Sequence, residues 1–294
     1  MRKLLTSSAR LAGATSITKL FLLLAIIAAT SVAASAARAA NIRTWVSGAG
    51  NDVDNTQCSL SDPCQTFAHA IAETASGGEL DCLDPGDFRP VTITISVTID
   101  CEGASNGGIT ATSGTAITIN TPSIVVNLIG LEINGMNEAF DGVYLDAAAY
   151  VSIRNCKIYG FGIDSGIDVR SGTLVVDNVF VAGNGYGIIA DSSTGVVNVT
   201  VRNSDINNNS QVGILVVGSG GRHAGATIEQ TTLAFNSTAM SVSEPGVAVI
   251  GGSTIVNNAQ GLAGGITYSF KNNQIGGNGT DGTPLTAYPG GPLN

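Results

Sequence analysis

The chain has 294 residues, of which 44% are hydrophobic, with 22 acidic and 13 basic side chains. Residues 1–40 hold five of the 13 Lys and Arg and no Asp or Glu, so the rest of the chain has 8 basic against 22 acidic residues, a net charge of −14. Such an acidic chain lacks the basic surface that nucleic acids require, and it would repel a polyuronate unless metal ions or a local basic spot intervened. We therefore expect no nucleic-acid partner.

The first 40 residues have the pattern of a secretory signal peptide. Basic residues precede the apolar run 20–29, and Ala37 to Ala39 supplies the small residues of a cleavage site. The alternative is an uncleaved membrane anchor, but the run is short against the roughly 20 residues that a spanning helix needs. We expect a secreted protein, periplasmic or extracellular, with no membrane span once residues 1–40 are removed.

Residues 41–77 are expected to form an N-terminal strand and a short capping helix. Asp62 fits the N-cap and Pro63 the first helical position. Phe67 and Ile71 then share one face, and Gly77 is expected to end the helix just before the next strand. Such a helix would cover the open end of the structure that follows, where apolar interior and unpaired strand edges would otherwise be exposed.

Residues 78–280 are dominated by short β-rich runs that become a regular repeat from Asp141 to Ile275. A small residue followed by alternating apolar residues recurs with a period of 21 to 26 residues, at Gly142, Gly166, Gly187, Gly213 and Ala239. A second marker begins with an amide, at Asn155, Asn178, Asn203, Gln230 and Asn272. Repeats of this length indicate a solenoid in which each repeat forms one coil. Residues 281–294 lack the pattern and are expected to form a C-terminal tail.

Stacked coils place equivalent residues in columns along the solenoid axis. The predicted inward columns are Val143/Leu145, Ile167/Val169, Ile188/Ala190, Ile214/Val216 and Met240/Val242 in the first strands, and Ile153/Ile158, Val176/Val181, Val201/Ile206, Ile228/Leu233 and Phe270/Ile275 in the second. The amides lie where the chain turns, because Asn tolerates a left-handed backbone and can bond to the next coil. We assign that column a structural role.

The five cysteines all follow residue 40, in a compartment where disulfides persist. Among the possible pairings we expect Cys58–Cys64, which encloses a short loop, and Cys82–Cys101, whose members are about one coil apart. Cys156 is left over at an inward position, which predicts a buried thiol rather than a nucleophile.

The repeat resembles the right-handed parallel β-helix proteins of the pectate-lyase-like superfamily. The resemblance is carried by the G-I-x-V and V-x-N-x-x-I runs, as in residues 166–181, and by the entry segment from Trp45 to Phe67, and it covers nearly all of residues 42–280. It implies an all-β fold, a single-stranded right-handed parallel β-helix. Glycoside hydrolases of this fold carry His-Gly and Arg-x-Lys runs that this sequence lacks. The resemblance is therefore specific for the fold and leaves the activity open.

One outward patch carries the functional prediction. Tyr144, Asp146, Asp168, Arg170 and Asp191 are expected to share the outward face of three successive coils, with Asp164 in a preceding turn. In the resembled family, substrate lies along an outward parallel sheet. Tyr144 and Asp164 are therefore candidate substrate-binding residues, and the other four are candidate catalytic residues.

This patch supports three hypotheses. The first is glycan or polysaccharide binding on the sheet face, without an established activity. The second is a polysaccharide lyase or glycoside hydrolase acting at Asp146, Asp168, Arg170 and Asp191, with Ca²⁺ as an optional cofactor on the three acids. The third is a structural or adhesive cell-surface protein, in which these charges simply pair on a solvated face.

Overall fold

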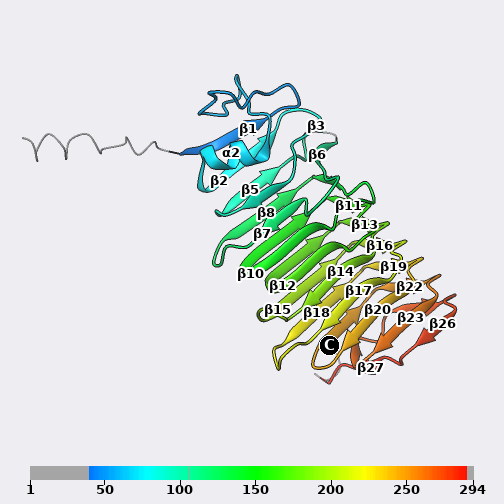
Figure 1. Cartoon of the computed structure of the whole chain (residues 1–294). Helices are drawn as coiled ribbons and strands as arrows, with labels where there is room; N and C mark the ends of the chain where they lie inside the picture. The colour runs from blue at the N-terminus through cyan, green and yellow to red at the C-terminus, as the bar shows by residue number, and fades with distance from the viewer. Residues whose placement is uncertain (1–39, 105, 290–294) are drawn as a thin grey trace, which may run out of the picture. The chain divides into compact units, whose positions relative to one another are not determined.

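The computed structural model describes residues 40–104 and 106–289, and the expected signal peptide lies outside them, apart from its last residue. The described residues form one compact unit. Every pairing between its named strands is parallel, and the strands stack coil upon coil (Figure 1). The expected all-β solenoid is therefore confirmed. In the described part of the chain, no helix is long and apolar enough to cross a membrane.

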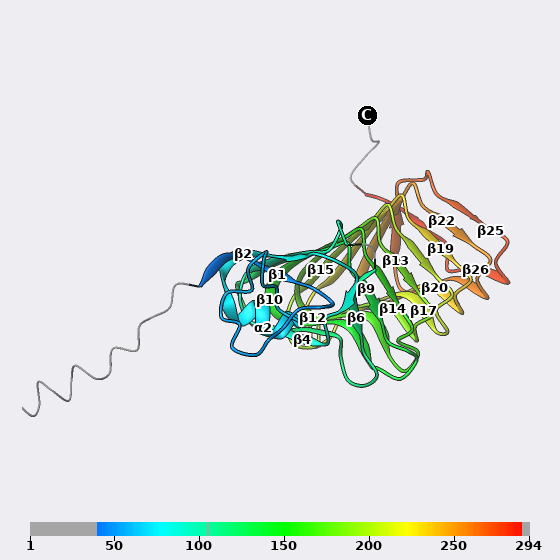
Figure 2. The ribbon, with the colours of Figure 1, turned by 90° about the horizontal axis from the view of Figure 1, so that it is seen from above.

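Three parallel ladders run along the solenoid. One is a nine-stranded sheet formed by β3 (Gly86–Asp87), β6 (Gly107–Thr110), β9 (Glu132–Asn134), β11 (Lys157–Tyr159), β13 (Phe180–Ala182), β16 (Asp205–Asn207), β19 (Thr232–Ala234), β22 (Thr254–Val256) and β25 (Gln274–Gly276). Several strands of this sheet, from β9 to β25, can be followed in Figure 2.

The other two ladders share their longest strands. What we call the first ladder contains β4 (Val91–Ile93), β7 (Ile117–Ile119), β10 (Asp141–Arg154), β12 (Ser165–Asp177), β14 (Tyr186–Asp191), β17 (Val212–Val217), β20 (Thr238–Ser243), β23 (Gln260–Gly264) and β26 (Thr280–Gly282). The second ladder contains β10 and β12 together with β1 (Asn41–Val46), β2 (Thr74–Cys82), β5 (Val97–Asp100), β8 (Val125–Ile129), β15 (Val197–Arg202), β18 (Ala224–Glu229), β21 (Val247–Gly251), β24 (Thr267–Ser269) and β27 (Thr286–Ala287).

The interior is filled by the predicted inward columns. Their β-branched and aliphatic side chains are buried in every coil from Val143 to Val242. The last predicted pair, Phe270 and Ile275, is only half-buried. Ser269, not Phe270, pairs with the inward Ile250 of the preceding coil, so the predicted alignment was one residue off at Phe270.

The expected amide column at the turns is confirmed in four coils. Asn155, Asn178, Asn203 and Gln230 all have a positive φ, between 48° and 54°. Gly252 takes the same position in a coil that the sequence pattern did not reveal, and Lys271, not Asn272, takes it in the next. The turn requires a left-handed backbone, and residues as different as Asn, Gln, Gly and Lys adopt it at this position.

The N-terminal helix is present but begins later and is shorter than expected. Helix α2 (Phe67–Glu73) has Thr66 as its N-cap, whose side chain accepts a hydrogen bond from the His69 N–H at 3.2 Å. Asp62 is wrong as the cap because the chain there pairs with other segments: Asp62 bridges Ser59, and Cys64 bridges Val46 of β1. These pairings hold residues 62–64 extended, so the helix cannot begin there.

Both expected disulfides are present, joining Cys58 to Cys64 and Cys82 to Cys101. The Cys156 thiol is free and buried, and burial raises its pKa to about 12. A thiol with such a raised pKa stays protonated at neutral pH and is a poor nucleophile. At the other end, β26 and β27 continue the ladders into the region expected to be a tail, as far as Ala287.

A second column of amides, absent from the sequence predictions, lies inside the turn after the nine-stranded sheet. Asn184, Asn209, Asn236 and Asn258 are buried, and each donates through Nδ2 to the Oδ1 of the equivalent amide in the following coil, at 2.9–3.1 Å, ending at Asn278. Each Oδ1 from Asn209 onward also accepts the backbone N–H of the preceding member. These amides satisfy backbone donors that the turn would otherwise leave buried and unpaired.

Asn209→Ala should lower the free energy of unfolding by about 2–4 kcal/mol, because it leaves the buried N–H of Asn184 without its acceptor and opens a gap in the column. Urea unfolding measures the change. Ser210→Ala is the matched control, since Ser210 is exposed and its side chain makes no hydrogen bond to the described residues. Equal stabilities for the two variants would show that the column is not a stabilising element.

Candidate functional site

The predicted patch on the first ladder is only partly assembled. Tyr144 pairs with Asp168 and Asp168 with Ile189, as expected for one outward column. A register shift after Leu145 moves Asp146 opposite Ser171, so the expected alignment of Asp146 with Arg170 is wrong. Thr194 instead donates to the Asp146 carboxylate at 2.8 Å.

Arg170 holds two of the predicted acids. Its guanidinium Nη2 lies 2.6 Å from Asp168 Oδ2, and Nη1 lies 2.6 Å from Asp191 Oδ2. Ser219 donates to the other Asp191 oxygen at 3.0 Å. Asp168 is only 2% exposed, so this is a largely buried charge cluster rather than a solvated face. Breaking such a cluster by removing one partner leaves an uncompensated charge.

Asp168 is electrostatically unusual. Its Oδ1 is buried and has no hydrogen-bond partner among the described residues. Burial raises the pKa of Asp168 to about 6, against the opposing effect of Arg170, and the nearby charges of Asp141 and Asp164 raise it further. Burial is also the largest cause of the raised pKa of Tyr144. The half-buried Asp164 is thus near the cluster, where it adds negative charge.

The three acids do not fit the Ca²⁺ site that the enzyme hypothesis predicts for them. The cation between Asp168 and Asp191 is the guanidinium of Arg170, and the bulge displaces Asp146. Among the described residues, the ligand atoms of Cys58, Cys64 and His69 do lie within 4.8 Å of one another, but the two cysteines form a disulfide. Catalysis at the Asp168–Arg170–Asp191 cluster stays a prediction.

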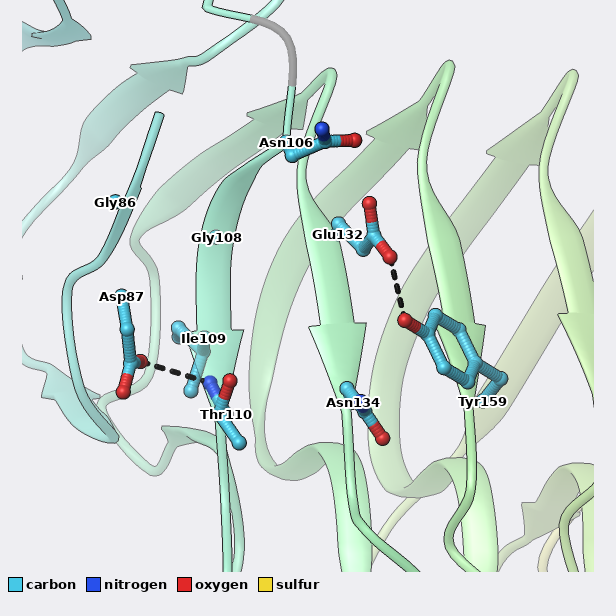
Figure 3. Close-up of a pocket in the computed structure, with 9 residues that line it drawn as sticks. All are labelled: Gly86, Asp87, Asn106, Gly108, Ile109, Thr110, Glu132, Asn134 and Tyr159. Carbon is cyan, nitrogen blue, oxygen red and sulfur yellow. Dashed lines mark hydrogen bonds between the residues drawn. The ribbon is translucent and has the colours of Figure 1, made fainter. Parts of the chain in front are cut away.

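A better-formed site lies on the outward face of the nine-stranded sheet, where sequence reasoning placed nothing. A cavity of about 400 Å³ spans β3, β6, β9 and β11, and its lining residues are shown in Figure 3. Six of them have polar side chains that can bond a ligand: Asp87, Asn106, Thr110, Glu132, Asn134 and Tyr159.

Glycines create the hollow. Gly108 pairs with Asp87 on one side and with Glu132 on the other, and a Cβ on Gly108 would lie 1.9 Å from the Glu132 carbonyl oxygen. Gly86 also lines the cavity without a side chain. The cavity surface is therefore bare backbone at these two glycines, and the side chains of β9 and β11 form its wall.

Two hydrogen bonds organise the wall and the rim. The Tyr159 hydroxyl donates to Glu132 Oε1, and these side chains point toward each other from neighbouring strands (Figure 3). Burial and this bond raise the pKa of Tyr159 to about 12, so it remains a neutral donor at physiological pH. On the opposite side, Asp87 Oδ1 accepts from the Thr110 N–H at 2.9 Å. Each carboxylate keeps a second oxygen that can accept a hydrogen bond from a ligand.

The polar face continues beyond the cavity along the solenoid. Lys157 pairs with Phe180 and Phe180 with Asp205, and a second hollow of about 240 Å³ lies among these outward residues. Phe180 is 41% exposed although it is a large apolar side chain. We call the residues Asp87, Asn106, Thr110, Glu132, Asn134, Lys157, Tyr159, Phe180 and Asp205 the sheet strip.

Part of the signal for the sheet strip is visible in the sequence. The predicted outward patch draws on the first strands of the coils from Asp141 onward, whereas Asp87 and Glu132 belong to earlier coils. Aligning the runs 108–110, 132–134 and 157–159 places Thr110, Asn134 and Tyr159 in one outward column, with Glu132 in the outward column beside it.

Residues 91–233 match the family model described as the right handed beta helix region, and the parallel coils continue on both sides of that match. This match and the stacked parallel coils together confirm the predicted right-handed parallel β-helix repeat architecture. A comparison with curated proteins gave no match, and neither did a comparison with solved structures.

The raised pKa of Asp168 predicts a pH dependence of stability. Because the folded protein holds this proton more tightly, with a pKa of about 6 against an ordinary 3.8, the carboxyl favours folding most at low pH, and this advantage is lost as pH rises through 6. Relative to Asp168→Asn, which does not titrate, the wild type should lose about 3 kcal/mol of unfolding free energy between about pH 3 and about pH 7.

Urea unfolding of both proteins at the two pH values measures this difference. Asp177→Asn is the control of opposite sign, because a hydrogen bond from Asn203 lowers the pKa of Asp177. The wild type should therefore gain unfolding free energy relative to Asp177→Asn as the pH rises from strongly acidic values toward neutral. A wild-type minus Asp168→Asn difference that is constant or rises with pH would contradict the prediction.

Proposed function

We propose that the protein binds an extended glycan on the sheet strip, with the chain of sugars lying along the solenoid axis. The observation that carries the proposal is the hollow of Figure 3, which is lined by two acids, two amides, two hydroxyls and an aromatic ring beside glycine backbone. Sugars present many hydroxyls and apolar C–H faces, and a ligand site with a few placed polar groups beside an aromatic side chain complements both.

The spacing of the coils favours an extended ligand. Parallel strands lie about 4.8 Å apart, so outward residues of successive coils repeat at about the length of one sugar unit. Tyr159 and Phe180 are on adjacent strands, β11 and β13, and Phe180 is exposed. Two aromatic side chains on neighbouring coils would contact successive parts of one chain.

The charges in the cavity point to the kind of glycan. Asp87 and Glu132 line it, and no basic side chain is among its described lining residues. A polyuronate would place like charges together there, whereas a neutral glycan or one bearing amino groups would not. The net charge of −14 beyond residue 40 acts in the same direction.

Export is part of the same proposal. The two disulfides are of the kind that persist outside the cytosol, and the signal pattern in residues 1–40 agrees with them. Glycans of this extended kind are found at cell surfaces and outside cells, so we propose that the protein acts in the periplasm or extracellularly.

A glycan array of neutral, amino-substituted and uronic oligosaccharides, followed by calorimetry on the best ligand, tests the proposal. We expect binding that is insensitive to EDTA and that falls about tenfold or more in Tyr159→Ala, because the ring contact and the orientation of Glu132 are both lost. Glu132→Gln separates the ligand classes, since it should weaken an amino sugar strongly and a neutral sugar little.

Tyr150→Ala is the matched control, because Tyr150 is 43% exposed and lies in the second ladder, away from the sheet strip. A preference for uronic glycans, or equal affinities for Tyr159→Ala and Tyr150→Ala, would contradict the proposed site. Breakdown products in the same incubations would instead favour the enzyme hypothesis.

A further inference from the structure

One aromatic residue has a backbone conformation that does not suit it. The residue after each strand in the later part of the nine-stranded sheet has a positive φ, and Gly or Asn takes this position in every coil from Gly160 to Gly277 except at Phe235. Phe235 has φ 58°. Gly and Asn tolerate this left-handed conformation, whereas a bulky side chain is strained in it.

Burial of the ring does not offset that strain. Phe235 is 63% exposed, one of the most exposed large hydrophobic side chains among the described residues. A strained residue with an exposed ring persists only where the surrounding structure fixes it, and such residues cluster at binding sites.

Phe235 lines a groove of about 920 Å³ at the turn that follows the nine-stranded sheet. The strands that lead into this turn, β16, β19 and β22, are neighbours in Figure 1. The described residues that line the groove carry no charged side chain and are mainly asparagines, serines and glycines. A charged ligand would therefore have no counter-charge there.

The asparagine side chains at the floor of the groove are hydrogen-bonded, whereas those at its edges are open to a ligand. Asn209 and Asn236 belong to the buried amide column, and their side chains are already bonded. Asn208 and Asn257 flank Phe235 on the neighbouring coils, and both are exposed with side chains that make no hydrogen bond to the described residues. Their amides can donate and accept at once on both sides of the ring.

We infer that this groove is a second carbohydrate site, one that binds uncharged sugar residues with Phe235 as a stacking platform. The ring contacts the apolar C–H face of a sugar, while Asn208 and Asn257 bond its hydroxyls. Asn208 to Asn257 spans two coil spacings, about 10 Å, which suits a short segment of an oligosaccharide. The inference does not depend on the sheet strip, because the two sites share no residue.

Substitutions at Phe235 separate ligand binding from folding. Phe235→Asn removes the ring and installs a residue that suits the left-handed backbone, so its thermal midpoint should equal or exceed that of the wild type. Phe235→Trp keeps an aromatic surface. Calorimetry with cellohexaose, xylohexaose and mannohexaose should show at least one ligand whose affinity falls about tenfold or more in Phe235→Asn and changes less than about threefold in Phe235→Trp.

The same titrations in a Tyr159→Ala background keep this site distinguishable from the sheet strip. Binding that survives Tyr159→Ala and is lost in Phe235→Asn supports the groove whether or not the sheet strip binds glycan. The inference is overturned if no neutral hexasaccharide binds, or if Phe235→Asn binds the ligand with wild-type affinity. It is also overturned if Phe235→Asn has a lower thermal midpoint than the wild type, or if polygalacturonate or chitosan hexamers bind the groove with higher affinity than the neutral hexasaccharide.

Discussion

The structure depends on every coil turning at the same place as the coil before it. Parallel hydrogen bonds fix the register between coils, so a turn that is one residue early or late would shift all following side chains to the wrong face. The chain meets this constraint with left-handed residues at the turns and with the buried column from Asn184 to Asn278. The amides of that column supply partners to backbone groups that the turns bury.

Once the turns are fixed, the interior and the exterior have separate roles. Inward positions need only apolar side chains of suitable size, and the chain supplies Val, Ile and Leu there in coil after coil. Outward positions are free of that requirement, so their chemistry can vary along the axis. The sheet strip and the groove at Phe235 arise from such variation. In the sheet strip, glycines such as Gly108 leave the backbone bare. In the groove, the aromatic side chain of Phe235 stands where other coils have Gly or Asn.

Buried charge in this fold has a different meaning from exposed polarity. Asp168, Arg170 and Asp191 are mutually bonded, and Asp168 is almost fully buried. Their geometry stabilises the cluster itself and leaves few atoms for a ligand. The polar groups of the sheet strip instead keep unpaired oxygens and amides at the surface, which is what a binding site requires.

Much of the architecture could be predicted from the amino-acid sequence: the solenoid, the inward columns as far as Val242, the left-handed turns at Asn155 and three equivalent positions, both disulfides and the burial of Cys156. These features depend on local periodicity and spacing, which are visible along the chain. The N-cap of helix α2 could not be predicted from the local sequence, because the bridge between Cys64 and Val46 of β1 overrides the capping signal at Asp62. Which outward residues meet depends on the packing of neighbouring coils. A register shift after Leu145 separates Asp146 from Arg170, and the absence of a side chain at Gly108 leaves a hollow beside Glu132 and Tyr159. Register and backbone approach are properties of neighbouring coils, and no single stretch of sequence contains them.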